Sequence, residues 1–144
     1  MLTLVIPVYN MESLLGRCMD TILAQRCRDF EILLVDDGST DGSGLLCDSY
    51  AADYPGFIRT VHRANGGLSS ARNAGIDAAR GEFVVFPDPD DRVEPDYVRH
   101  LLELQKRYDA DLVCTGYFVA TDAGSVPGSA DTEPAILSGP EAQR

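Results

Sequence analysis

The chain has 144 residues, of which 44% are hydrophobic and 24% charged, the composition of a globular domain that can bury a sizeable core. Its formal net charge of -11 argues against a nucleic-acid partner, because binding a phosphate backbone requires a basic surface. Lys106 is the only lysine, which excludes a phosphate-binding loop that depends on lysine.

The sequence also carries information on the compartment. No apolar run approaches the roughly 20 residues of a membrane helix, and the first residues resemble a strand, without the basic region of a signal peptide. The four cysteines lack the C-x-x-C spacing of zinc sites and lie mostly among apolar residues; they are Cys18, Cys27, Cys47 and Cys114. We therefore expect reduced thiols and a cytoplasmic location.

Strand-like and helix-like patterns alternate along the chain. We predict strands at residues 2–8, 30–35, 57–62, 82–86 and 112–120, and helices at residues 12–25, 42–54 and 68–79 and after Glu94-Pro95. This alternation predicts an α/β fold with a mostly parallel sheet flanked by helices. Residues 121–134 are rich in Gly, Ser, Asp and Pro, which predicts a loop, and Ser138 resembles the cap of a helix that would continue beyond Arg144.

The segment that ends in Asp88-Pro89-Asp90-Asp91 is the most informative. Because alternate residues of a strand share a side, Asp88 and Asp90 can direct their carboxylates to one point at the end of the predicted strand. A divalent cation such as Mg²⁺ or Mn²⁺ would relieve the repulsion between these carboxylates and could hold a phosphorylated ligand. The alternative is a solvated acidic turn before a helix. Pro87 and Pro89 restrict the backbone on both sides of Asp88.

Two further polar segments follow predicted strands: Tyr9-Asn10, and Asp36-Asp37 with Gly38 and Ser39. Ligands of parallel sheets bind at the carboxyl ends of the strands, so we expect the three segments to converge on one site. A buried carboxylate there could accept a hydrogen bond from a nucleobase or a ribose hydroxyl. The alternative for Asp36-Asp37 is a turn and helix cap.

Arg72 lies on a predicted helix that follows Gly66-Gly67. The glycines permit close approach of a ligand to the backbone, and Arg72 could neutralise a diphosphate or contact a base. The alternative is a salt bridge from Arg72 to Asp36 or Asp37. We predict that His62 packs or hydrogen-bonds at a strand end and that His100 is exposed, and we assign neither to catalysis.

Four motifs in order resemble one family: Ile6-Pro7-Val8-Tyr9-Asn10, residues 35–41, Gly67-Leu68-Ser69-Ser70-Ala71-Arg72-Asn73, and Asp88-Pro89-Asp90-Asp91. Over residues 2 to 115 they look like the nucleotide-sugar half of the inverting family 2 glycosyltransferases. The resemblance implies a nucleotide-diphospho-sugar transferase (GT-A, Rossmann-like) fold, here truncated. It also implies a nucleotide-sugar-binding domain at residues 1–120, with a loop and the start of an acceptor-side segment at residues 121–144.

The same resemblance assigns roles to residues. It implies a nucleotide pocket lined by Pro7, Tyr9 and Asn10, base and ribose recognition by Asp36 and Asp37, and a base or diphosphate contact from Arg72; Gly67 and Asn73 belong to the same motif. Asp88 and Asp90 match the D-x-D motif, in which the second Asp is the usual metal ligand and Asp88 also borders the substrate. The family commonly has Leu and Ser where this chain has Pro87 and Pro89.

The implied reaction moves a sugar, with a UDP-sugar as the first expectation, to a hydroxyl of a saccharide or glycolipid acceptor, with inversion and with Mn²⁺ or Mg²⁺. The role would be polysaccharide, cell-wall or glycoconjugate synthesis, with peripheral membrane association at the inner face through segments outside this chain. No residue after Asp91 matches the family's general base, which we expect beyond Arg144, so this chain should bind the sugar donor and transfer poorly.

Three competing functions differ in their sequence requirements. A non-catalytic nucleotide-sugar-binding module would need the same pocket without the chemistry. A phosphoacceptor receiver domain would carry its acidic pair after the first strand and a lysine after the last strand, which this chain does not. A sugar nucleotidyltransferase would have a basic, glycine-rich loop after the first strand, where this chain has Met11-Glu12-Ser13.

Overall fold

The computed structural model describes residues 1–121 and 124–128. The strands are β1 (Leu2–Val8), β2 (Phe30–Asp36), β3 (Ile58–His62), β4 (Phe83–Val85), β5 (Phe118–Thr121) and β6 (Gly124–Pro127), and the helices are α1 (Leu15–Leu23), α2 (Ser43–Asp53), α3 (Leu68–Ala78) and α4 (Tyr97–Tyr108). The chain forms two compact units that divide between His100 and Leu101. No helix in the described ranges is long and apolar enough to cross a membrane.

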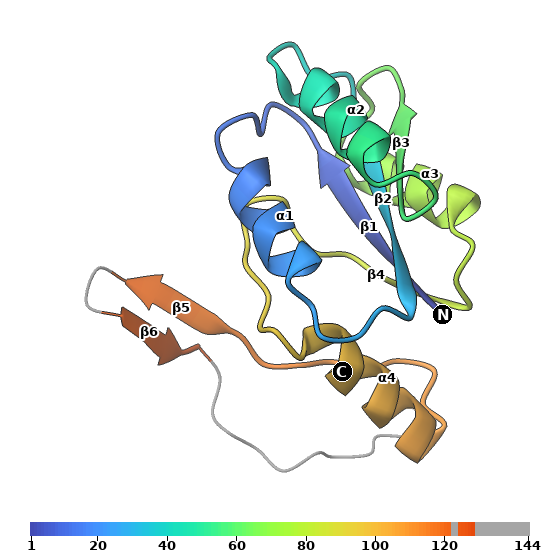
Figure 1. The fold of residues 1–144 in the computed structure, drawn as a ribbon, viewed down its shortest axis with the longest axis vertical. Helices are drawn as coiled ribbons and strands as arrows, with labels where there is room; N and C mark the ends of the chain where they lie inside the picture. Colours follow the sequence, from blue (N-terminus) through green and yellow to red (C-terminus); the bar gives the residue numbers. More distant parts are fainter. Residues whose placement is uncertain (122–123, 129–144) are drawn as a thin grey trace. The chain divides into compact units, whose positions relative to one another are not determined.

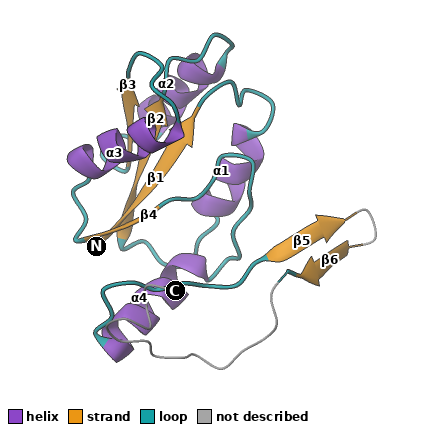
Figure 2. Ribbon diagram, turned by 180° about the vertical axis from the view of Figure 1, so that it is seen from behind, coloured by secondary structure: helices purple, strands orange, loops and turns teal. Residues whose placement is uncertain are grey.

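The first unit is built on a four-stranded parallel sheet with the order β3-β2-β1-β4 (Figure 1). Every residue of β1 and β2 is buried, as expected for central strands covered on both faces. Right-handed crossovers place α1 and α2 on one face, and α3, which connects β3 to β4 across the sheet, on the other (Figures 1 and 2). The predicted parallel α/β fold is therefore confirmed for this unit.

Close packing of α3 depends on small residues. Ala71 of α3 is fully buried against Val5, Leu33 and Val35 of the sheet. Gly75 lies one turn further along, and a methyl group added there would collide with Cγ1 of Val5. The small residues thus let the helix backbone approach β1 closely, which fixes the start of α3 relative to the carboxyl ends of the strands.

The amino end of the sheet is closed by a buried polar network around Glu31. The Glu31 carboxylate accepts hydrogen bonds from the Thr3 hydroxyl (2.9 Å), the Arg59 guanidinium (3.1 Å) and the Arg80 amide (2.8 Å). Burial alone would raise the pKa of Glu31, but the hydrogen bonds, with that of Arg59 the largest, hold it below its ordinary value. The network joins β1, β2, β3 and the connection from α3 to β4.

The prediction of a fifth strand at residues 112–120 is mostly wrong. Only Phe118–Thr121 is extended, and β5 pairs antiparallel with β6 in a separate two-stranded sheet. Residues 124–127, predicted as loop, form β6 instead. An apolar run shows that a segment can be a strand but does not identify its partner, and β5 satisfies its backbone groups with the neighbouring segment. Residues 122–123 and 129–134 of the predicted loop and the helix start at Ser138 lie outside the described residues.

The other element boundaries differ from prediction by a few residues. The largest shift is at α1, which begins at Leu15, three residues after the predicted start. Its physical cause is that the Met11 amide donates to the Ser43 hydroxyl (2.8 Å) and the Glu12 amide to the Asp41 carboxylate (3.3 Å). These amides face the loop after β2, and the chain turns into α1 only afterwards.

Candidate functional site

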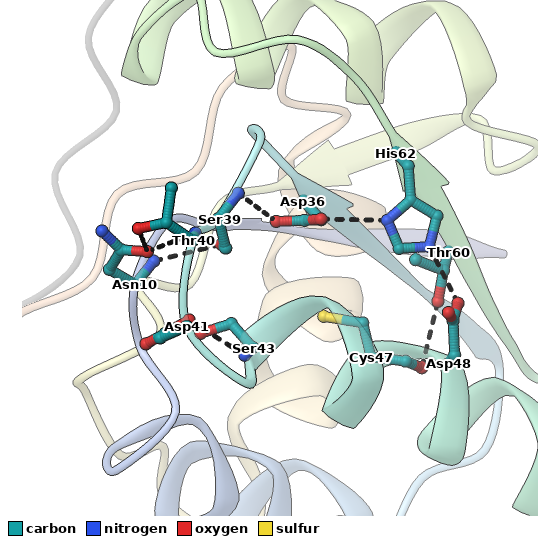
Figure 3. Close-up of polar contacts among 10 residues, drawn as sticks. All are labelled: Asn10, Asp36, Ser39, Thr40, Asp41, Ser43, Cys47, Asp48, Thr60 and His62. Atoms are coloured by element: carbon teal, nitrogen blue, oxygen red, sulfur yellow. Dashed lines mark hydrogen bonds and ion pairs between the residues drawn. The ribbon is translucent and has the colours of Figure 1, made fainter.

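Asn10 joins the loops that follow β1 and β2 (Figure 3). Its backbone has the left-handed φ of 55°, which Asn tolerates better than most residues. Its amide donates to Ser39 Oγ (3.1 Å), and its Oδ1 accepts the Thr40 N–H (2.8 Å). Tyr9, beside it, is 46% exposed, whereas Pro7 is buried within β1 opposite Val35. Of the predicted pocket residues on this segment, Tyr9 and Asn10 thus reach the surface.

Asp36 ends β2 and is 6% exposed. Its Oδ1 accepts the Ser39 N–H (3.0 Å), and its Oδ2 lies 2.9 Å from Nδ1 of His62 (Figure 3). Burial favours a higher pKa, but the hydrogen bonds from Ser39 and His62 outweigh it and lower the pKa of Asp36. The carboxylate therefore stays ionised and fixes the loop after β2. The predicted place of His62 at a strand end, with hydrogen bonds, is confirmed.

Asp37 is saturated with hydrogen bonds from the chain itself. Its carboxylate accepts from Arg63 Nη1 (2.5 Å), from the Gly67 amide (2.7 Å) and from the Gly66 amide (3.1 Å). Arg63 also donates to Ser70 Oγ (2.7 Å). Gly67 has a φ of 84°, a left-handed conformation that favours glycine, and it directly precedes α3. Asp37 thus fixes the turn that begins α3.

The proposed alternative for Arg72, a salt bridge to Asp36 or Asp37, is wrong. Arg72 Nη2 instead donates to Asp88 Oδ1 (2.9 Å), and its guanidinium lies 5.7 Å from the centre of the Phe86 ring. The reason is the position of Arg72 on α3. It lies half a helical turn past Ser70 and therefore faces the segment after β4, whereas Asp37 pairs with Arg63. Arg72 Nε is buried and has no hydrogen-bond partner among the described residues. Asn73, the last residue of this motif, is exposed.

The acidic segment after β4 places its prolines inward and its carboxylates outward. Pro87 and Pro89 are buried, Asp88 is half-buried, and Asp90 and Asp91 are exposed. A turn holds the segment, since the Asp91 amide donates to the Asp88 carbonyl (3.1 Å). Burial raises the pKa of Asp91 first, and the charges of Asp90 and Asp88 raise it further. Three carboxylates thus repel one another at an open edge of the sheet.

The thiol of Cys18 supports this segment from α1. Cys18 donates to the Asp88 carbonyl (3.5 Å). Burial, and then the charges of Asp91, Asp90 and Asp88, raise the pKa of Cys18 to about 12. The group therefore remains a thiol that packs and donates, without the reactivity of a thiolate.

The donor set suits a hard divalent cation. Carboxylate oxygens are the preferred ligands of Mg²⁺ and Mn²⁺, and a cation would relieve the repulsion that raises the pKa of Asp91. Arg72 occupies only Oδ1 of Asp88, and Asp90 forms no hydrogen bond or ion pair with the described residues. Within residues 1–121 and 124–128, however, no three His, Cys, Asp or Glu side chains are grouped as a complete metal site, so substrate or solvent oxygens would have to complete the coordination.

Sequence reasoning missed Arg63. The structure shows why Arg63 matters: His62 pairs in register with Asp36, so Arg63 and Asp37, the residues that follow β3 and β2, lie side by side, and this register is not encoded locally in the sequence. Arg63 and Arg72 together tie the start of α3 to Asp37 and Asp88. The structure therefore links the acidic segments after β2 and β4 through one helix.

Sequence comparison finds relatives over most of the chain. The family model described as Glycosyl transferase family 2 matches residues 3–139. The chain is 42% identical over 118 residues to the uncharacterized glycosyltransferase EpsJ of Bacillus subtilis, covering 82% of this chain and 34% of that protein. It is 39% identical over 117 residues to the glycosyltransferase GlyA of Streptococcus pneumoniae, covering 81% of this chain and 17% of that protein. The chain thus spans about a third or less of these relatives.

Solved structures agree in fold. The crystal structure of S. aureus TarS 1-349 in complex with UDP-GlcNAc has a TM-score of 0.70 and 25% identity, over 76% of this chain and 32% of that one. The mannosyltransferase PcManGT from Pyrobaculum calidifontis in complex with GDP-Man and Mn²⁺ has a TM-score of 0.67 and 28% identity, over 72% of this chain and 32% of that one. The predicted GT-A fold is confirmed by these neighbours.

Proposed function

Because the chain belongs to glycosyl transferase family 2, we propose that it forms the sugar-donor-binding part of an enzyme that transfers a sugar from a nucleotide diphosphate to an acceptor hydroxyl. The observation that supports this most is the gathering, at the carboxyl ends of the strands, of Asn10, the Asp36-Asp37 pair and Asp88 with Arg72. Ligands of parallel sheets bind at this edge. UDP-GlcNAc and GDP-Man, which two structural neighbours bind, are the kinds of donor to test.

We assign the nucleoside to the surface near Tyr9 and Asn10. Asp36 and Asp37 both direct their carboxylates to the chain's own N–H groups, so their first contribution is to shape this surface. A direct contact of either carboxylate with base or ribose stays a prediction, because both side chains are buried among the chain's own groups. Gly67 directly precedes α3 and Asn73 lies within it, and we propose that both border the bound donor.

We assign the diphosphate to Arg72 and to a cation held by Asp90 and Asp88. The buried Nε of Arg72 lacks an acceptor, and a phosphate oxygen would supply one. A bound Mn²⁺ or Mg²⁺ would offset the negative charge that develops on the departing nucleoside diphosphate. Arg72 would then donate to Asp88 through Nη2 and to the phosphate through Nε, while the cation would offset part of the charge of Asp88.

Transfer with inversion requires a general base on the acceptor hydroxyl, and we place that base outside this chain. A positioned base typically contributes about 10²–10⁴-fold to the rate. The isolated chain should therefore bind the sugar donor and transfer the sugar poorly. For the whole protein we propose a saccharide or glycolipid acceptor, a role in polysaccharide or cell-wall synthesis, and a cytoplasmic location with peripheral attachment to the inner face of the membrane.

Titration calorimetry of the chain with UDP-GlcNAc and with GDP-Man, each with and without Mn²⁺, tests the proposal. We expect binding of one of them, strengthened by about tenfold by the metal, which corresponds to about 1.4 kcal/mol. A matched titration in which a Na⁺ salt replaces the Mn²⁺ salt at equal ionic strength controls for electrostatic screening. Absence of binding to either compound in the presence of Mn²⁺ would contradict the proposed function.

A further inference from the structure

His62 lies between two carboxylates at the end of β3 (Figure 3). Its Nδ1 is 2.9 Å from Asp36 Oδ2 on β2, and its Nε2 is 2.8 Å from Asp48 Oδ1 on α2. A neutral imidazole carries one N–H and can donate to only one of two carboxylates. Both short contacts can be hydrogen bonds to carboxylate oxygens at once only when the ring is doubly protonated and cationic.

The surroundings of His62 favour this charge. The hydrogen bond to Asp36, and then that to Asp48, raise the pKa of His62, and burial opposes them less strongly. Cys47 of α2 is a further titratable group in this corner, and burial, followed by the charges of Asp36, Asp48 and Asp41, raises its pKa to about 12, so that it remains neutral. Thr60 on β3 donates to the Cys47 carbonyl (3.0 Å). The two carboxylates are thus the charged groups that His62 faces from β2 and α2.

A continuous chain of hydrogen bonds leads from this ring to the proposed nucleoside surface. Asp36, held by His62 through Oδ2, accepts the Ser39 N–H through Oδ1, and the Ser39 hydroxyl accepts the Asn10 N–H. The Asn10 side chain in turn accepts the Thr40 N–H. The conformation of Asn10, with its left-handed φ, is therefore maintained by groups that depend on Asp36.

We propose that His62, as an imidazolium held between Asp36 and Asp48, is a positioning residue that fixes the Ser39 and Asn10 loops for binding of the donor's nucleoside. This inference rests on the proposed function and adds a regulatory property to the same site. When the ring loses a proton, one carboxylate loses its N–H and faces a ring lone pair. Donor affinity then falls as the pH rises through the pKa of His62.

The ring titration tests the charge independently of any ligand. His62 and His100 are the only histidines, so NMR of His100→Gln leaves a single imidazole signal and identifies it as His62. We expect it to titrate above the ordinary value of about 6.5, and to titrate lower in Asp48→Asn, which removes one carboxylate charge without touching Asp36. A ring that titrates at or below about 6.5 would overturn the inference.

Donor binding tests the positioning role. UDP-GlcNAc and GDP-Man suit the purpose, because their diphosphates are esterified on both sides and carry no proton that titrates near neutrality. Affinity would be measured from about pH 5.5 to about pH 8.5, the range in which protein histidines titrate. Thermal unfolding of each variant defines the temperature range in which it is folded. Affinities are compared at one temperature at which all variants are folded.

We expect the affinity of the unmodified chain to fall by about fivefold, the typical value of one lost hydrogen bond, across the pH range in which His62 titrates. Asp48→Asn should shift this fall to lower pH, and His62→Gln should bind weakly at every pH, while His100→Gln should match the unmodified chain. A purely structural histidine would lower the unfolding temperature of His62→Gln but leave affinity and its pH profile unchanged, and that result would overturn the inference. If the unmodified chain binds neither compound at any pH, the proposed function fails and the positioning role fails with it, while the ring titration still decides the charge of His62.

Discussion

The two ends of the parallel sheet use the same chemistry to different effect. At the amino end, the Glu31 carboxylate is 5% exposed and every hydrogen bond it accepts comes from the chain itself. At the carboxyl end, Asp37 forms an equally closed pair with Arg63, but Asp88 and Arg72 form a pair in which both side chains are partly exposed. Beyond that pair lie Asp90 and Asp91, which pair with no arginine among residues 1–121 and 124–128.

The difference separates stability from ligand binding. The charge of Glu31 is matched within the fold, so it stabilises the folded chain and offers nothing to a ligand. The carboxyl end carries an excess of negative charge on exposed oxygens, and the buried Nε of Arg72 there has no acceptor among the described residues. A metal and a diphosphate together would supply both missing partners. The buried ion pair of Asp37 with Arg63 also lies at the carboxyl end, but like Glu31 it serves the fold, because it holds the start of α3.

The substitution Glu31→Gln should have the largest effect, and only on stability. It removes the charge that neutralises Arg59, which is only 24% exposed, and leaves a largely buried cation unpaired. We expect a loss of about 3 kcal/mol in the free energy of unfolding, measured by denaturant titration. Nucleotide-sugar affinity of the folded protein should not change, because Glu31 lies at the other end of β2 from the site.

Asp96, which pairs near the surface with Arg26 and Arg99, offers a matched control for Glu31→Gln. Asp96→Asn should leave the unfolding midpoint almost unchanged, because exposed ion pairs contribute little. The free energy of unfolding should also depend on pH through Glu31. Because the fold lowers the pKa of Glu31, its carboxylate stabilises the fold above the unfolded pKa of about 4.5, and this contribution is lost as the pH falls through the folded pKa. The contrast between the two ends fails if Glu31→Gln reduces nucleotide affinity while stability is unchanged.

The substitution Asp90→Ala should have the next largest effect, and only on metal-linked binding. Asp90 is exposed and forms no bond within the described residues, so the fold should be unaffected. We expect the strengthening of nucleotide-sugar binding by Mn²⁺ to be largely lost, a change of about tenfold measured by calorimetry. Asp91→Ala is the matched control, and an equal loss there with Asp90→Ala unaffected would show that Asp91 is the ligand.

Most of the fold follows from sequence patterns, whereas the pairings within the site do not. Four parallel strands, their helices and the three polar segments at strand ends are predictable, because apolar periodicity and strand direction are local properties. The pairing of arginines with carboxylates is not: the register of β3 on β2 places Arg63 beside Asp37, the packing of α3 on β1 places Arg72 beside Asp88, and both are tertiary properties. The pairing of β5 with β6 is likewise set by tertiary structure, and the apolar run of β5 alone does not predict it.

The smallest predicted effect concerns Asp91 and has the opposite sign to that of Glu31. Burial and the charges of Asp90 and Asp88 raise its pKa, so the folded chain favours the protonated form. Its ionisation therefore costs stability above the folded pKa, and this cost disappears as the pH falls towards the unfolded value of about 3.8. Asp91→Asn should stabilise the chain at neutral pH by less than about 1 kcal/mol, because the side chain is exposed and solvent screens the repulsion. Thermal unfolding with and without Mn²⁺ gives the decisive measurement: bound metal neutralises the same repulsion, so the stabilising effect of Asp91→Asn should shrink when Mn²⁺ is present. An effect of the same size in both conditions would mean that no cation binds beside these carboxylates, and the two ends of the sheet would then differ only in exposure.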